Sequence, residues 1–232
     1  MGTLQSGKSP GQRVDAGNAV LDRASSADAR SVKKRLDAFR SAHRAFSSGH
    51  AVAEKASAAL IAQQRTIGEL DAVQDDAVEA WASARTGAGA KRLQPFADLK
   101  GPSASDIKGM GDRAEAELIV KLAAKDKKHP DAKVKKTAAA ADAAARAVLK
   151  ASDPIKALTR TRDAAVSARD AIGIRWEKAF ASLKRGARAA EDDGAVGVFA
   201  SLFDAPTAAP KAKKVKIAPA PAATSASNGA PS

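Results

Sequence analysis

The sequence contains no cysteine among its 232 residues. Disulfide frameworks and cysteine-ligated zinc sites are therefore excluded. No run of 18 or more apolar residues occurs, so no membrane-spanning helix is predicted, and the first residues lack the apolar segment of a secretory signal. These absences favour a cytoplasmic location, with association to a nucleoid, or a nuclear location if the source is a eukaryote.

Large apolar side chains are also scarce. The chain has six phenylalanines, two tryptophans and no tyrosine, and most of its 44% hydrophobic content is alanine. Alanine gains little free energy on burial, but it is the strongest helix former. This composition predicts long helices that pack closely through small residues, and not a thick globular core.

The first half of the chain contains two stretches with the apolar spacing of a helix. The first follows Ser25 and Ser26, which can cap a helix, and Ser47-Ser48-Gly49 offers a break or hinge after it. The second runs from about 50 to 85 and ends at the glycines of 86–89. The predicted buried seams are Val32, Leu36, Phe39, His43 and Phe46, then Leu60, Ile67, Leu70, Ala77 and Trp81.

The second half repeats this organisation. A third stretch begins near Asp131, and Asp153-Pro154, a suitable helix start, separates it from a fourth that ends near Ala190. No strand candidate stands out. The predicted seams are Val134, Ala138, Ala141, Ala145 and Val148, then Ile155, Leu158, Ala165, Ile172, Trp176, Ala179 and Leu183.

We therefore expect an all-α fold, an elongated antiparallel helical bundle or coiled coil of two similar helical hairpins with disordered termini. Val-Lys-Lys recurs at 32–34 and 134–136, which suggests an old tandem duplication, although alanine-rich amphipathic helices resemble one another in any case. The breaks at 47–49 and 152–154 are compatible with turns or with kinks. The expected segments are a flexible arm (1–24), a hairpin (25–86), a linker with short helices and a basic segment (87–130), a second hairpin (131–204) and a disordered basic Pro/Ala tail (205–232).

Residues Gly2 to Ser9 match the letters of a nucleotide-binding P-loop, G-x-x-x-x-G-K-[ST]. A P-loop follows a buried strand and opens a helix, so that its N–H groups face phosphate. Here only Met1 precedes the glycine, Pro10 removes an N–H from the next helical turn, and no apolar strand ending in aspartate follows to hold magnesium. We therefore expect no nucleotide at this segment and no loss of ATP binding in Lys8→Ala.

No arrangement typical of an active site is found. The chain has no cysteine nucleophile and no Gly-x-Ser-x-Gly turn, and its three histidines have no identifiable serine and aspartate partners. His43 and His50 lie seven residues apart, and not at the i, i+4 spacing of a helical metal pair. We interpret both as seam residues, and we expect no enzymatic activity, no metal and no cofactor.

Residues 103–122 read SASDIKGMGDRAEAELIVKL. Ile107, Gly109-Met110-Gly111, Ala114 and Leu118 resemble a helix-hairpin-helix element, a family in which two short helices flank a Gly-hydrophobic-Gly turn that binds a DNA phosphate through backbone N–H groups. The resemblance covers about 20 residues and implies phosphate contacts at the two glycines and at Met110. Asp112 departs from the pattern, because its carboxylate would repel phosphate; the alternative is an ordinary loop whose aspartate caps a helix.

The net charge is +13, which attracts polyanions or only solvates helix faces. Residues 121–136 hold seven lysines against two aspartates, and the PKAKKVKIAP segment of the tail resembles linker-histone tails and nuclear-import signals in composition. Neither stretch contains an aromatic residue, so backbone contacts are favoured over base readout. The predicted nucleic-acid contacts are Lys108, Gly109, Met110, Gly111, Arg113, Lys121, Lys125, Lys127, Lys128, Lys133, Lys135, Lys136, Lys211, Lys213, Lys214 and Lys216.

Two functional hypotheses follow. The first is a non-enzymatic helical protein that associates with nucleic acid, independently of sequence, through its basic segment and tail. It requires that the basic residues gather on one surface. The second is a structural or scaffold coiled-coil protein that binds itself or a protein partner, and it requires an exposed apolar seam that carries Trp81, Trp176, Phe199 or Phe203.

Overall fold

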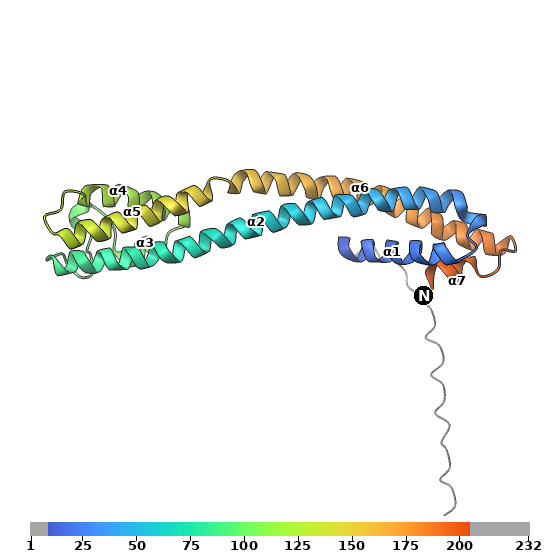
Figure 1. The fold of residues 1–232 in the computed structure, drawn as a ribbon, viewed down its shortest axis with the longest axis horizontal. Coiled ribbons are helices and arrows are strands. Elements are labelled where there is room, and N and C mark those ends of the chain that lie inside the picture. The colour runs from blue at the N-terminus through green and yellow to red at the C-terminus, as the bar shows by residue number, and fades with distance from the viewer. Residues whose placement is uncertain (1–8, 205–232) are drawn as a thin grey trace, which may run out of the picture.

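The structure, a computed structural model, describes residues 9–204. This part of the chain is all-α and contains no strand, as the sequence predicts. Figure 1 shows an elongated rod in which one helix, α2, runs along most of the length. The elements are α1 (Pro10–Ser26), η1 (Arg30–Val32), α2 (Lys33–Gly87), η2 (Ala97–Leu99), α3 (Ala104–Lys108), α4 (Asp112–Asp126), α5 (Ala132–Ser152), α6 (Ile155–Asp192) and α7 (Val198–Phe203).

The first predicted break does not interrupt the chain, because α2 continues through Ser47, Ser48 and Gly49 for 55 residues. A glycine inside a helix costs only about 1 kcal/mol, and here α6 covers the site. A Cβ added at Gly49 would lie 3.3 Å from Ile172 Cδ1. Residues 25–86 therefore do not form a hairpin of their own, and that predicted unit is wrong.

The return path of the rod consists of α5 and α6, each packed along α2. Only Asp153 and Pro154 separate the two helices, so the second predicted break is a short interruption and not a reversal. Because Pro154 has no N–H to donate, it interrupts the helix without turning the chain back. Residues 131–204 are therefore no separate hairpin either; the long hairpin pairs the two halves of the chain.

The predicted arm of residues 1–24 is wrong from residue 10 onward, where α1 begins. Ser9 caps this helix: its hydroxyl accepts the Gln12 N–H, and the Gln12 side chain accepts the Ser9 N–H at 3.0 Å. Pro10 occupies the first helical position, where its missing N–H costs nothing. Val20 and the half-buried Val14 and Leu21 then anchor α1 on the rod. Lys8 and the rest of residues 1–8 lie outside the described residues.

Two apolar cores stabilise the rod, one near each end. The first joins the last third of α2 to α4 and α5 around Trp81, Phe96 and Ile119. The second joins α1, the first turns of α2, the end of α6 and α7 around Phe39, Phe46 and Trp176. The predicted seams of residues 32–46 and 134–148 are buried at every position. No helix within residues 9–204 is long and apolar enough to cross a bilayer.

Candidate nucleic-acid interface

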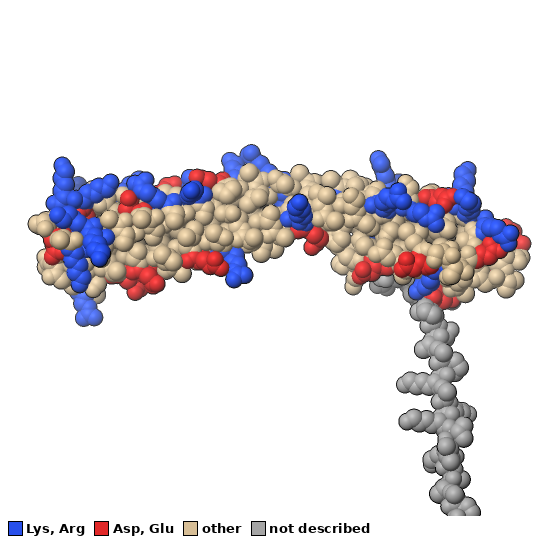
Figure 2. All heavy atoms as spheres, viewed as in Figure 1, with Lys and Arg blue, Asp and Glu red and all other residues tan. Residues whose placement is uncertain are grey.

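Basic side chains gather at the end of the rod where α2 stops and α4 turns into α5. This surface, which we name the cationic end, comprises residues 85–101 and 121–136 and is at the left in Figure 2. It holds eleven basic residues against three acidic ones. The basic residues are Arg85, Lys91, Arg92, Lys100, Lys121, Lys125, Lys127, Lys128, Lys133, Lys135 and Lys136, and the acidic ones are Asp98, Asp126 and Asp131.

Ten of these eleven cations are exposed, and none of the ten forms an ion pair within residues 9–204. The eleventh, Arg85, is buried and is bound to Asp126 and Asp98. Asp131 is engaged as well, because its carboxylate accepts the N–H groups of Lys133 and Val134 at the start of α5. The exposed charge of the cationic end is therefore almost entirely positive, and it attracts polyanions.

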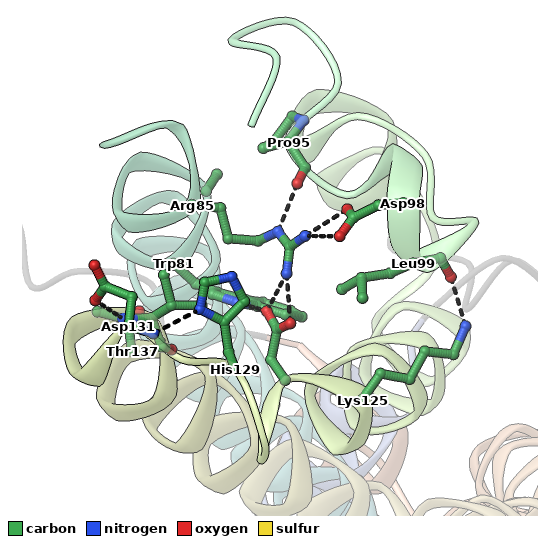
Figure 3. Close-up of polar contacts among 12 residues, drawn as sticks. Trp81, Arg85, Pro95, Asp98, Leu99, Lys125, His129, Asp131 and Thr137 are labelled. Carbon is green, nitrogen blue, oxygen red and sulfur yellow. Dashed lines mark hydrogen bonds and ion pairs between the residues drawn. The ribbon is translucent and has the colours of Figure 1, made fainter. Parts of the chain in front are cut away.

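A buried polar network holds the cationic end in shape (Figure 3). The Arg85 guanidinium donates to both carboxylates and, through Nε, to the Pro95 carbonyl at 2.6 Å. Trp81 Nε1 donates to Asp126 Oδ2 at 2.8 Å. The network links α2, the loop after it and the last turn of α4. It therefore fixes the loop after α2 and the end of α4, two of the segments that carry the exposed cations.

Phe96 of the cationic end and the neighbouring Trp81 are buried aromatic residues. Phe96 packs against Trp81 with ring centroids 4.5 Å apart, and both side chains are fully covered. A base cannot stack on either ring. The apolar group that is exposed in this loop is Leu93, at 83%. The surface suits contact with a phosphate backbone better than contact with unstacked bases.

The Gly109-Met110-Gly111 segment connects α3 to α4, so the local order of helix, turn and helix agrees with the resemblance. The N–H groups of Gly109 and Met110 are already used, because they donate to Ser105 and Ile107 carbonyls in the last turn of α3. Both glycines have negative φ, which any residue can adopt. The turn therefore has fewer free donors for a phosphate than the resemblance implies.

The surroundings of this turn are acidic. Residues 66–84 and 103–119, which we name the acidic belt, contain nine acidic residues and two basic ones. Lys108 is bound to Glu79, and Arg113 contacts Glu117 and Asp153. Neither cation is therefore free to bind phosphate, and the acidic belt would repel it. We leave the turn, Lys108 and Arg113 out of the interface proposed below.

Glu115 is a buried carboxyl group within the acidic belt. It is 1% exposed beside Gln74 of α2, and its Oε1 atom has no hydrogen-bond partner within the described chain. Burial raises the pKa of Glu115 to about 7, and the charges of Asp75 and Asp71 act in the same direction. The carboxyl group is therefore half protonated near neutral pH.

The structure thus brings together the seven predicted lysines of residues 121–136 and separates them from Lys108 and Arg113. Lys211, Lys213, Lys214 and Lys216 lie outside the described residues. Sequence reasoning missed Lys91, Arg92 and Lys100 as members of this surface. The sequence does show a basic pair, Lys91-Arg92, directly after the glycines that end α2. Only the fold shows that this loop lies beside the α4–α5 turn (Figure 1).

The histidines of the seam have structural contacts. His43 accepts the Trp176 indole N–H at Nδ1, at 3.0 Å, and its Nε2 lies 2.8 Å from Asn18 Oδ1. Because Nδ1 accepts, Nε2 carries the proton and donates to Asn18. Burial lowers the pKa of His43, which favours this neutral form. Residues 9–204 contain no group of three or more histidine, aspartate or glutamate side chains that could hold a metal ion.

Comparisons with protein-family models, with curated proteins and with solved structures found no match to this chain.

Proposed function

We propose that this protein is a non-enzymatic helical protein that associates with the backbone of nucleic acid independently of base sequence. The observation that carries the proposal is the set of ten exposed cations at the cationic end, none of them ion-paired within residues 9–204. Cations of this kind bind phosphates and release the counterions that had condensed on the nucleic acid. The four tail lysines, Lys211, Lys213, Lys214 and Lys216, add charge to the same interaction.

Two further features support this reading over base-specific recognition. Trp81 and Phe96 are buried, so the cationic end offers no aromatic platform. Its lysines extend from α4, α5 and the loop after α2, and the Arg85 network joins this loop to α4. The cations are thus spread over three segments and not along a single helix. We therefore expect similar affinity for duplexes of different sequence.

The scaffold hypothesis needs an exposed apolar seam. Trp81 and Trp176 are buried at 0% and 2% exposure, and Phe199 and Phe203 are half-buried against the end of α6. Of the exposed large apolar residues of α2, Val52 and Val73 lie on one side of the helix, 21 residues apart, and Ile61 lies on another side. The burial of both tryptophans therefore favours the nucleic-acid hypothesis over the scaffold hypothesis.

A gel-shift titration with duplex DNA over a salt series tests the proposal. Both the full chain and a chain that ends at Asp204 should bind at low salt, the full chain more tightly, and binding should weaken steeply as salt is added. Binding by the full chain alone would assign the interaction to the tail and reject the cationic end. Absence of binding by either chain at low salt would reject the whole proposal.

Sequence independence needs its own comparison. An A·T-rich and a G·C-rich duplex of equal length should bind within about threefold of each other, because phosphate contacts carry no base information. A single-stranded RNA competitor distinguishes duplex from single-strand preference. A difference of about a hundredfold or more between the two duplexes would show base readout and contradict the proposed mode.

A further inference from the structure

The two antiparallel sides of the rod differ in charge. α2 carries eight basic and seven acidic residues, whereas α5 and α6 together carry 14 basic and six acidic residues. In Figure 2, Lys and Arg predominate along the upper edge of the rod, which α5 and the first part of α6 form until α6 passes below α2 (Figure 1). The positive charge is thus not confined to the cationic end; it extends along the return path of the chain.

A line of exposed cations follows the outward side of α5 and α6. On α5, Lys136 and Lys150 lie opposite the buried seam that includes Ala141 and Ala145, by the periodicity of the helix. On α6, the corresponding positions are opposite the buried side chain of Trp176. We name this surface the outer ridge; its members are Lys136, Lys150, Lys156, Arg160, Lys178 and Arg185, all of them exposed.

The cations of the outer ridge form no ion pair within residues 9–204, whereas most acids of α5 and α6 do. Asp142 at the flank of α5, for example, is bound to Arg146. The remaining pairs are Asp163 with Arg162, Asp170 with Arg169, and Glu177 with Arg13. The flanking acids are therefore largely neutralised, and the ridge keeps a positive surplus that faces solvent.

The outer ridge begins at the cationic end, and its cations are unevenly spaced: 14 residues separate Lys136 from Lys150, and 18 separate Arg160 from Lys178. It starts beside Lys133 and Lys135, and the interruption at Asp153-Pro154 spans only two residues between Lys150 and Lys156. From Lys136 to Arg185 the helices extend for about 74 Å at 1.5 Å per residue. At 3.4 Å per base pair, this corresponds to roughly 22 base pairs of duplex.

We infer that the outer ridge is a second contact surface for nucleic acid, along which a bound duplex lies lengthwise. The inference rests on the proposed function and extends it from a contact at one end to a footprint of about 20 base pairs. Backbone phosphates are the chemistry that such a ridge recognises, because exposed and unpaired lysine and arginine side chains along one side of two helices attract a linear array of negative charge.

The length dependence of binding tests this inference on the full chain. The affinity for duplexes from about 8 to about 30 base pairs is measured over a salt series, with correction for the number of overlapping sites. The dependence of log K on log salt should steepen up to about 20 base pairs and then level off. Levelling off at about 10 base pairs would overturn the inference and leave the cationic end as the only contact. No binding at any length would instead reject the proposed function itself.

Charge removal at the ridge provides a second test. The variant Lys150→Gln, Lys156→Gln, Arg160→Gln, Lys178→Gln and Arg185→Gln should reduce the salt slope on a duplex of about 30 base pairs by roughly 4 to 5. On a duplex of about 10 base pairs, which the cationic end alone can hold, it should bind like the unmodified chain. Helical content by circular dichroism checks that the fold is retained.

A matched control removes the same number of positive charges from ion pairs elsewhere. Its changes are Arg30→Gln, Lys33→Gln, Arg40→Gln, Arg65→Gln and Lys108→Gln, each at a side chain bound to an acid. This control should keep most of the salt slope on the long duplex. Equal losses in the two variants would mean that net charge alone sets the affinity, and would overturn the outer ridge as a surface.

Discussion

Each tryptophan of the chain donates its indole N–H to a buried polar partner, and each pair stabilises one end of the rod. Trp81 binds Asp126 beside Arg85, and Trp176 binds His43 beside Asn18. In a chain whose apolar content is mostly alanine, these few large side chains supply much of the burial. A change at either polar partner should therefore affect a whole end of the molecule.

Arg85→Ala should lower the free energy of unfolding by about 3 to 5 kcal/mol, because the change leaves Asp126 charged and buried without its partner. Urea denaturation followed by tryptophan fluorescence measures this. Arg92→Ala, which removes an exposed and unpaired cation of the same end, should change the free energy by no more than about 0.5 kcal/mol. Equal effects of the two changes would contradict a structural role for the Arg85 network.

Glu115 should make the stability of the rod depend on pH. Its pKa is raised to about 7 in the folded chain, above the ordinary value of 4.5, so the folded state favours the protonated form. The stability that Glu115 contributes is fully present below pH 4.5 and is lost as the pH rises through 7. We expect this one group to lower the free energy of unfolding by about 2 to 3 kcal/mol across that range.

Glu115→Gln imitates the protonated carboxyl group and should remove this loss. Urea denaturation at several pH values between 4 and 8 measures the free energy of unfolding. The variant should be more stable than the unmodified chain only at the higher pH values. The matched control is Glu117→Gln, an exposed neighbour on the same helix, which should leave the pH profile unchanged. A Glu115→Gln profile parallel to that of the unmodified chain would show that the carboxyl group does not titrate in this range.

At the scale of the elements, sequence periodicity predicted the helices well and their boundaries less well. Phe39 and Val148 are buried, as the predicted seams require, and α5 begins next to Asp131, where the third stretch was expected to start. Gly49 could not be interpreted in the same way, because the contact with α6 that stabilises the helix there comes from 120 residues further along the chain. The tandem duplication remains a hypothesis.

The sequence analysis missed α1 because this helix has few apolar residues. Its closest contact with α2 is also made at a glycine, which has no side chain and therefore gives no apolar signal in the sequence. A Cβ added at Gly17 would lie 2.2 Å from His43 Nδ1, and His43 is held between Trp176 and Asn18. Gly17→Ala should therefore displace α1 and destabilise the chain by about 1 to 3 kcal/mol. Thermal denaturation, with tryptophan emission as the probe, measures the effect.

Gly68→Ala is the matched change, because a Cβ there meets nothing within 4 Å. It should stabilise α2 by up to about 1 kcal/mol through helix propensity alone. The two alanine substitutions are thus expected to have opposite signs. If Gly17→Ala were also stabilising, the docking of α1 against His43 would be wrong.

At the scale of the whole molecule, the fold sorts charge that the sequence distributes along the chain. Lys127 and Lys128 were identifiable as a basic run, but only the fold brings their turn, at His129, beside the loop that carries Lys91. The same folding brings the glycine turn after Lys108 against Glu79 and its acidic neighbours. Local composition therefore predicted the lysines of 121–136 as part of the candidate surface but wrongly included the glycine turn and Lys108. The turn could not be excluded from sequence alone, because the acids that neutralise Lys108 come from a distant segment of the chain.

The measurement that tests the central claim most directly is the salt dependence of duplex binding in two variants that each lose four positive charges. One carries Lys127→Gln, Lys128→Gln, Lys133→Gln and Lys135→Gln at the cationic end. The other carries Arg30→Gln, Lys33→Gln, Arg40→Gln and Arg65→Gln, at side chains that are ion-paired on the surface. We predict that the first variant loses roughly 3 to 4 from the salt slope and the second less than about 1. Equal slopes for the two variants would contradict the claim that the free cations of this end bind the phosphate backbone.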